Sequence, residues 1–324
     1  MKAALCKQFG GPDGIVVEDI PEPEPGPGEV VIEVRAAALN FYDTLMIRDK
    51  YQLKPPMPFS PAGEVAGTVA ALGPDVAGFA AGDRVLAYIK WNGCRERTLA
   101  RANDLVRIPD GVGDEAAAGL TVTYGTAIHG LKDRGHLREG ETVAVLGASG
   151  GAGLAAIEIA KAMGARVIAA ASSPEKLAVC EARGADLLLD YKAEDLKMRL
   201  KELTEGQGAD IVYDCVGGAF SEPALRSTAW EGRFLVIGFA SGEIAKMPLN
   251  LALLKGLDIV GVFWNAFADR NPRANSENMA QILDWCASGT LQPHIHGTFP
   301  LAETAAALTV LDTRQAKGKV LVCP

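Results

Sequence analysis

Residues 143–153, VAVLGASGGAG, decide the fold of this chain. A β-branched apolar run ends in a turn that carries four glycines, and apolar residues at helical spacing follow over 154–163. Glycines let the backbone approach a pyrophosphate closely, and the first N–H groups of the following helix can bind that anion. The order of strand, glycine turn and helix therefore predicts a dinucleotide site, held by Gly147, Ser149, Gly150, Gly151 and Gly153.

Five further apolar runs alternate with helical segments up to residue 263. The runs lie at 166–171, 186–190, 209–216, 233–238 and 257–263, and helical segments lie at 174–183 and 193–203. Strands that alternate with short helices form parallel sheets with helices on both faces, and strands buried on both sides are nearly continuous apolar runs. We therefore expect a doubly wound, Rossmann-like α/β domain over residues 123–265. The alternative is a sheet of this kind that binds nothing at its glycine turn.

The end of the second strand indicates which dinucleotide binds. An NAD site usually places Asp or Glu roughly 20 residues after the glycines, where it binds the ribose 2′-hydroxyl. No acid stands there in this chain; Ser172 and Ser173 follow the strand, and Lys176 lies just beyond. Hydroxyl and ammonium groups suit a 2′-phosphate, which a carboxylate would repel. These residues predict NADPH as the cofactor, although the two serines can also cap a helix that starts at Pro174.

Composition and charge exclude several classes of function. The 324 residues carry a net charge of −8, so neither nucleic acid nor an anionic membrane is an expected partner. No apolar run reaches the length of a membrane span, and the apolar part of the N-terminus is too short for a signal sequence, so we expect a cytoplasmic protein. The six cysteines form no CxxC pair, and His294 and His296 lack a third ligand nearby, so no metal site is predicted.

Residues 1–122 show a different pattern. Short β-rich pieces, separated by turns rich in Pro and Gly, indicate an antiparallel or barrel-like domain. After residue 265, a helix at about 275–288 and a terminal strand at 318–322 remain. This tail is too small to fold alone, so we expect residues 266–324 to return and complete the first domain. The length of the chain also favours two domains.

Several motifs carry a family resemblance, and they occur in the expected order. They are LNFYDTLMIRDKYQ (39–52), PFSPAGEVAGTVAALG (58–73), GLTVTYGTA (119–127), VYDCVGG (212–218) and GRFLVIG (232–238). With the glycine turn, they resemble the medium-chain dehydrogenase/reductase superfamily and, within it, the zinc-free NADPH:quinone oxidoreductase (zeta-crystallin-like) group. The resemblance implies a GroES-like, β-rich catalytic domain beside the Rossmann domain. It also implies a homodimer that pairs the sixth Rossmann strand edge to edge.

The resemblance also bears on zinc and on the reaction. Zinc alcohol dehydrogenases of this superfamily place a Cys where Asn40 stands here, and a His-Glu pair where this chain has Gly63 and Glu64. Because no Lewis acid would polarise an alkoxide, we expect hydride transfer to an acceptor that is already electrophilic. A quinone is the first expectation. The alternatives are an α,β-unsaturated carbonyl (enone, enal or enoyl thioester) and a non-catalytic, crystallin-like NADPH-binding protein.

Site residues follow from the same resemblance. The catalytic candidates are Tyr51, near the substrate, Asn40, beside the nicotinamide ribose, and Asp43, for which a structural cap is the alternative. Tyr51 is expected to orient the acceptor or donate a hydrogen bond, while solvent delivers the proton. Tyr191 is expected near the 2′-phosphate, or is simply a strand-end aromatic. The remaining expected cofactor contacts are Thr126, Phe239, Phe263, Trp264, Asn265 and Lys319, the last with a solvated lysine as the alternative.

Overall fold

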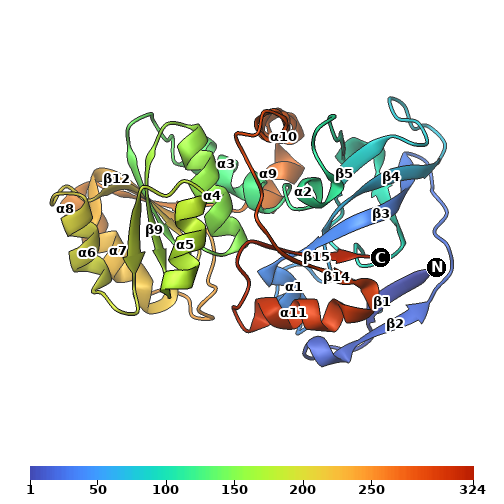
Figure 1. Cartoon of the computed structure of the whole chain (residues 1–324), viewed down its shortest axis with the longest axis horizontal. Helices are drawn as coiled ribbons and strands as arrows, with labels where there is room; N and C mark the ends of the chain where they lie inside the picture. Colours follow the sequence, from blue (N-terminus) through green and yellow to red (C-terminus); the bar gives the residue numbers. More distant parts are fainter. The chain divides into compact units, whose positions relative to one another are not determined.

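The computed structural model describes all 324 residues, which form two compact units (Figure 1). Unit 1 comprises Met1–Val122 and Pro293–Pro324, and unit 2 comprises Thr123–Gln292. The sequence placed residues 266–292 in the first domain, but the structure places them in unit 2. The reason is helix packing: α10 (Pro272–Ala287) lies against α3 (Thr123–Ile128) and α9 (Trp264–Arg270), so its apolar face is covered within unit 2.

Unit 2 contains a six-stranded parallel sheet, which confirms the predicted Rossmann-like fold. Its strands stand in the order β10-β9-β8-β11-β12-β13, the order of a doubly wound dinucleotide-binding sheet. The central strand β8 carries the apolar run that precedes the glycine turn, and its residues 143–146 are completely buried, as expected when helices cover both faces. The strands are β8 (Thr142–Leu146), β9 (Arg166–Ala171), β10 (Leu187–Asp190), β11 (Ala209–Asp214), β12 (Thr228–Val236) and β13 (Asp258–Gly261).

Two crossover helices of unit 2, α5 and α6, begin after residues whose side chains accept from free backbone N–H groups. Ser173 caps α5 by accepting from the Lys176 N–H, and Asp195 caps α6 by accepting from the Met198 N–H at 2.8 Å. Pro174 at the first position of α5 needs no partner for its nitrogen. Besides α3, α9 and α10, the helices of unit 2 are α4 (Gly151–Ala162), α5 (Pro174–Ala182), α6 (Leu196–Leu203), α7 (Ser221–Arg226) and α8 (Asn250–Lys255). Unit 2 also has a π-helical turn (His129–Arg134) and the 3₁₀ turn Gly218–Phe220.

Unit 1 is β-rich, as predicted. One sheet has the order β14-β15-β3-β4-β5-β7, with β6 also paired to β3, and a separate hairpin-like sheet joins β1 and β2. The strands are β1 (Lys2–Cys6), β2 (Ile15–Asp19), β3 (Glu29–Leu39), β4 (Glu64–Leu72), β5 (Arg84–Tyr88), β6 (Arg97–Arg101), β7 (Leu105–Arg107), β14 (Ile295–Pro300) and β15 (Lys319–Cys323). The helices are α1 (Phe41–Met46), α2 (Asp114–Ala118) and α11 (Thr304–Asp312), with 3₁₀ turns at Pro12–Gly14, Ala102–Asp104 and Leu301–Glu303.

Strand register in unit 1 brings distant residues together. Ala38 of β3 pairs with Glu64 of β4, and Leu39 of β3 pairs with Val320 of β15. Asn40 directly follows β3 and Lys319 begins β15, so three polar side chains meet at this end of the sheet.

No helix of the chain combines the length and the apolar composition that crossing a bilayer requires.

Six non-glycine residues of unit 1 have left-handed backbone, and Asp49 and Ala62 are two of them. Asp49 has φ 56° and Ala62 has φ 69°. Both are L-residues in a backbone conformation that L-residues normally avoid because of its energetic cost. Asp49 lies on the surface, where its carbonyl accepts from Lys54 Nζ at 2.8 Å.

Candidate functional site

The glycine turn of unit 2 is shaped for close backbone packing. Gly147 has φ +70°, and Gly150 is the N-cap of α4. A Cβ added at Gly153 would lie 2.6 Å from Ala148 Cα and in still closer contact with Gly147 O, so only glycine lets α4 pack on the turn. The first N–H groups of α4 lack partners within the helix, as in any α-helix. This end of β8 therefore has the form of an anion site.

Residues at the ends of β9 and β10 lie next to one another. Lys176 Nζ donates to Ser172 Oγ at 3.2 Å, while Ser173 is occupied as the helix cap. The Tyr191 N–H donates to Ala171 O at 3.1 Å, which brings Tyr191 to the end of β9, and its ring packs on Phe220 with centroids 4.6 Å apart. The hydroxyl and the ammonium are thus gathered where the sequence predicted a 2′-phosphate, and the helix-cap alternative holds for Ser173.

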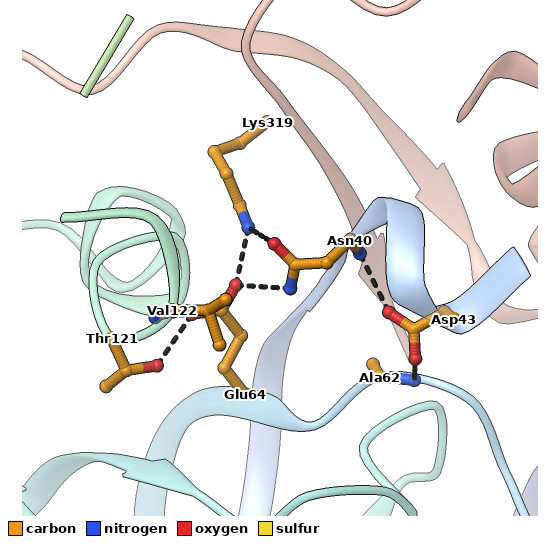
Figure 2. A network of polar contacts seen from close by, with 7 residues as sticks. All are labelled: Asn40, Asp43, Ala62, Glu64, Thr121, Val122 and Lys319. Atoms are coloured by element: carbon orange, nitrogen blue, oxygen red, sulfur yellow. Dashed lines mark hydrogen bonds and ion pairs between the residues drawn. The ribbon is translucent and has the colours of Figure 1, made fainter. Parts of the chain in front are cut away.

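Unit 1 contains a second polar cluster, the Glu64 network, made of Asn40, Glu64, Thr121, Val122 and Lys319 (Figure 2). Lys319 Nζ donates to Asn40 Oδ1 at 2.8 Å and also to Glu64 Oε1. Asn40 Nδ2 donates to Glu64 Oε1 at 2.7 Å. The other carboxylate oxygen accepts from Thr121 Oγ1 at 2.6 Å and from the Val122 N–H at 2.8 Å. Lys319 is buried, so it is not a solvated lysine.

Asp43 takes the structural role that the sequence left open. Its Oδ2 accepts from the Asn40 N–H at 2.8 Å and its Oδ1 from the Ala62 N–H at 2.9 Å, as Figure 2 shows. Both carboxylate oxygens are therefore used by backbone donors, one of them in the capping box of α1. Burial raises the pKa of Asp43 to about 7. These contacts support a cap that shapes the turn around Ala62.

Tyr51 stacks on Tyr42, with ring centroids 5.2 Å apart and planes at 19°. Burial raises the pKa of both phenols, so both stay protonated at neutral pH. The Tyr42 hydroxyl is buried, has no hydrogen-bond partner and lies over Gly63. A Cβ at Gly63 would contact this hydroxyl and lie 2.6 Å from Lys90 O. Position 63 therefore has no room for a side chain.

The remaining predicted contacts of unit 2 divide into exposed and buried residues. Phe239 and Phe263 are exposed, Thr126 lies in α3, and the buried Asn265 Oδ1 has no hydrogen-bond partner. Trp264 differs from the expectation. Its ring packs where a Cβ of Gly125 would lie, and its Nε1 donates to Asn275 Oδ1 at 2.9 Å. These contacts support a packing role for Trp264 rather than contact with a cofactor.

Two side chains of the Glu64 network, those of Glu64 and Thr121, were not among the site residues singled out from the sequence. Glu64 was used only in the comparison of Gly63 and Glu64 with the His-Glu pair of zinc alcohol dehydrogenases, and Thr121 was assigned no role. A signal was present, because Glu64 opens an otherwise apolar strand that is buried at its start. A carboxylate is rarely buried without partners, so its burial predicts a polar network. No group of three or more His, Cys, Asp and Glu side chains lies close enough together to bind a metal ion.

Comparisons with known proteins agree with this architecture. Residues 26–133 match the family model of the alcohol dehydrogenase GroES-like domain, and residues 151–288 match that of zinc-binding dehydrogenases. The chain is 37% identical to quinone oxidoreductase-like protein 2 of Rattus norvegicus over 322 residues, which cover 99% of this chain and 91% of that protein. It is 29% identical to an acryloyl-coenzyme A reductase of Sulfurisphaera tokodaii, with 100% of both chains covered.

Solved structures show the same fold along the whole chain. A mycobacterial protein complexed with NADPH has 31% identity and a TM-score of 0.93, with 100% of both chains covered. The Escherichia coli quinone oxidoreductase, also complexed with NADPH, has 26% identity and a TM-score of 0.92 with the same coverage. Together with the sequence relatives, these similarities show that the chain is an oxidoreductase that belongs to the quinone oxidoreductase group of the medium-chain dehydrogenase/reductase superfamily.

Proposed function

We propose that this protein is a zinc-independent, NADPH-dependent quinone reductase. The observation that carries the proposal is the Glu64 network: Asn40 stands where the resembled zinc enzymes have a Cys ligand, and its amide is hydrogen-bonded to Glu64 and to the Lys319 ammonium. Glu64 is neutralised by the buried Lys319 ammonium, and the position before it has no room for a His. Such a site is suited to an acceptor that is electrophilic without activation by a metal.

The residues of unit 2 fit NADPH. The glycine turn is a cradle that a Cβ at Gly153 would fill, and the N-terminus of α4 suits the pyrophosphate. Ser172 and Lys176 provide a hydroxyl and an ammonium for the 2′-phosphate, with Tyr191 beside them. The unpartnered Asn265 Oδ1 is an acceptor that a ligand N–H would satisfy. When bound, NADPH supplies a hydride from nicotinamide C4.

Unit 1 supplies binding and orientation. The resemblance implies that Asn40 and Lys319 would donate hydrogen bonds to the cofactor. Tyr51, held by its stack on Tyr42, is a neutral hydrogen-bond donor for the oxygen that gains charge during reduction. Asp43 is used by two backbone N–H groups and is not needed as an acid. The proton that completes reduction comes from solvent.

An α,β-unsaturated carbonyl is the second candidate acceptor. The similarity to an acryloyl-coenzyme A reductase over the whole chain favours it, because an enoyl thioester accepts hydride with the same needs as a quinone. The two acceptors differ in the shape of the substrate cleft. A panel assay that follows NADPH oxidation with quinones, enones, enals and enoyl thioesters separates them. Turnover of quinones with the highest kcat/KM supports the proposal; faster turnover of enoyl thioesters would replace it. NADPH binding without turnover of any acceptor would support a crystallin-like role.

We also propose that two copies of the chain pair through β13. This strand ends the sheet of unit 2, so one of its edges has no partner within the chain. Leu253 and Leu254 on α8 and Trp230 on β12 are exposed, and the Trp230 ring lies near Gly256, two residues before β13. Exposed apolar side chains beside an open strand edge favour cover by a partner. Light scattering of the protein and of Leu253→Asp tests this. The wild type should have the mass of a dimer and the variant the mass of a monomer. A wild type with the mass of a monomer contradicts pairing through β13.

A further inference from the structure

The Glu64 carboxylate is the centre of its network. It is completely buried, and its two oxygens accept four hydrogen bonds. The donors come from three places in unit 1: Asn40 after β3, Lys319 at the start of β15, and the segment Thr121–Val122. A carboxylate has about four acceptor positions, so every one of them is used. Glu64 itself has no capacity left for a ligand.

The neighbours of Asn40 determine how its amide is turned. Oδ1 faces the Lys319 ammonium, which only donates, and Nδ2 faces the Glu64 carboxylate, which only accepts. In the reversed amide, Nδ2 would face the Lys319 ammonium, donor against donor, and Oδ1 would face the Glu64 carboxylate, acceptor against acceptor. The network therefore admits one orientation. In that orientation, the second hydrogen of Asn40 Nδ2 is not used by Glu64.

From these contacts we propose that Glu64 is a positioning residue for NADPH binding. It holds the Asn40 amide and the Lys319 ammonium in the arrangement that presents their remaining N–H groups to hydroxyl oxygens of the cofactor, and it acts only through them. Thr121 supports Glu64 from the other side, through its hydroxyl. This inference rests on the proposed function, in which Asn40 and Lys319 contact NADPH.

The test compares steady-state kinetics of the full-length protein and three variants, with NADPH and a quinone. Glu64→Gln removes the charge and leaves only one acceptor oxygen for four donors. Thr121→Val removes a single hydrogen bond to Glu64 and keeps the shape of the side chain. The matched control is Asp312→Asn, which breaks the ion pair with Arg48 (2.8 Å) in the same unit and outside the network. Urea unfolding of each variant accompanies the kinetics.

The KM for NADPH is expected to rise at least tenfold in Glu64→Gln and about threefold in Thr121→Val. The KM for the quinone should stay within twofold of the wild type in both variants. The control should keep both KM values, even where its unfolding midpoint falls. This split separates positioning from a merely structural role, which would lower the active fraction or the midpoint and leave the KM for NADPH unchanged.

A double variant provides an independent check. Because Glu64 acts only through Asn40 and Lys319, adding Glu64→Gln to the double variant Asn40→Ala, Lys319→Met should raise the KM for NADPH by less than twofold beyond that double variant alone. Full multiplication of the two effects contradicts the inference. If Glu64→Gln does not fold, Thr121→Val decides: a KM for NADPH within 1.5-fold of the wild type overturns the inference. A wild type that binds no NADPH would overturn the proposed function, and this inference with it.

Discussion

Replacing Gly153 by Ala tests the packing of the glycine turn. An added Cβ would lie 2.6 Å from Ala148 Cα and 2.6 Å from Ala148 O, against 3.4–4 Å in ordinary van der Waals contact. These neighbours are backbone atoms and cannot rotate away, so the turn or α4 must move by nearly 1 Å. Such overpacking costs about 1–3 kcal/mol. Ala has a helix propensity about 1 kcal/mol more favourable than Gly, which offsets part of this cost. Where overpacking costs about 3 kcal/mol, Gly153→Ala should therefore lower the free energy of unfolding by about 2 kcal/mol.

Gly150→Ala is the matched control within the same turn. Gly150 has φ −75°, and the nearest atom to its added Cβ is Gly147 O at 3.5 Å. Its stability should therefore stay within about 1 kcal/mol of the wild type. Any loss of NADPH affinity in this variant then comes from contact between the new methyl group and the ligand, and not from a rearranged turn.

The assay is urea unfolding followed by tryptophan fluorescence, together with an NADPH titration of each variant. Gly153→Ala should unfold at a lower urea concentration than Gly150→Ala and should bind NADPH more weakly than the wild type. The reasoning is refuted if Gly153→Ala matches the wild type in both midpoint and NADPH affinity, because the turn would then have room for a side chain.

Three further predictions concern single side chains. Lys176→Ala should weaken NADPH binding by about 1–3 kcal/mol, the range for a hydrogen bond to a charged group, and leave NADH nearly unchanged; equal losses in calorimetric titrations with the two cofactors would show that Lys176 does not contact the 2′-phosphate. The pKa of Asp43 is raised from 3.8 to about 7 in the folded protein, so the folded state binds the proton of this carboxyl more tightly than the unfolded state does. This tighter binding stabilises the fold. The stabilisation is complete below about pH 4 and is lost as the pH rises through about 7. Relative to Asp43→Asn, which does not titrate, the wild type should lose about 2–3 kcal/mol of unfolding free energy between about pH 5 and about pH 8; a difference between the two proteins that is independent of pH would contradict this. Tyr51→Phe should lower kcat with a quinone by no more than about tenfold, because a general acid typically contributes about 10²–10⁴-fold and solvent is expected to supply the proton; a drop above about 10³-fold with unchanged NADPH affinity would identify Tyr51 as an essential acid.

Local patterns in the sequence predicted unit 2 well. The glycine turn, the apolar strand β8 and the pair of Ser172 and Lys176 all lie within short stretches, where spacing alone fixes which residues are neighbours. The structure brings Ser172 and Lys176 into contact as expected. The C-terminal boundary of unit 2 could not be predicted from local patterns. Helix α10 belongs to unit 2 because it packs on α3, which lies about 150 residues earlier in the chain.

The Glu64 network could not be predicted in this way. Asn40 and Lys319 are 279 positions apart, and they meet only because β15 pairs with β3 in one particular register. A lysine near the end of a chain is usually solvated, and nothing local indicates that this one is buried. Trp264 is a second case: its place after a strand end suggested a ligand contact, and nothing in the sequence indicated that its ring packs on Gly125.

The most direct test of the account is the kcat/KM for NADPH with a simple quinone, measured on protein whose zinc content has been determined and which has been treated with a chelator. We expect turnover that is independent of zinc, unaffected by the chelator, and much faster with NADPH than with NADH. Activity that is lost on chelation and restored by zinc, or an equal rate with NADH, would contradict it.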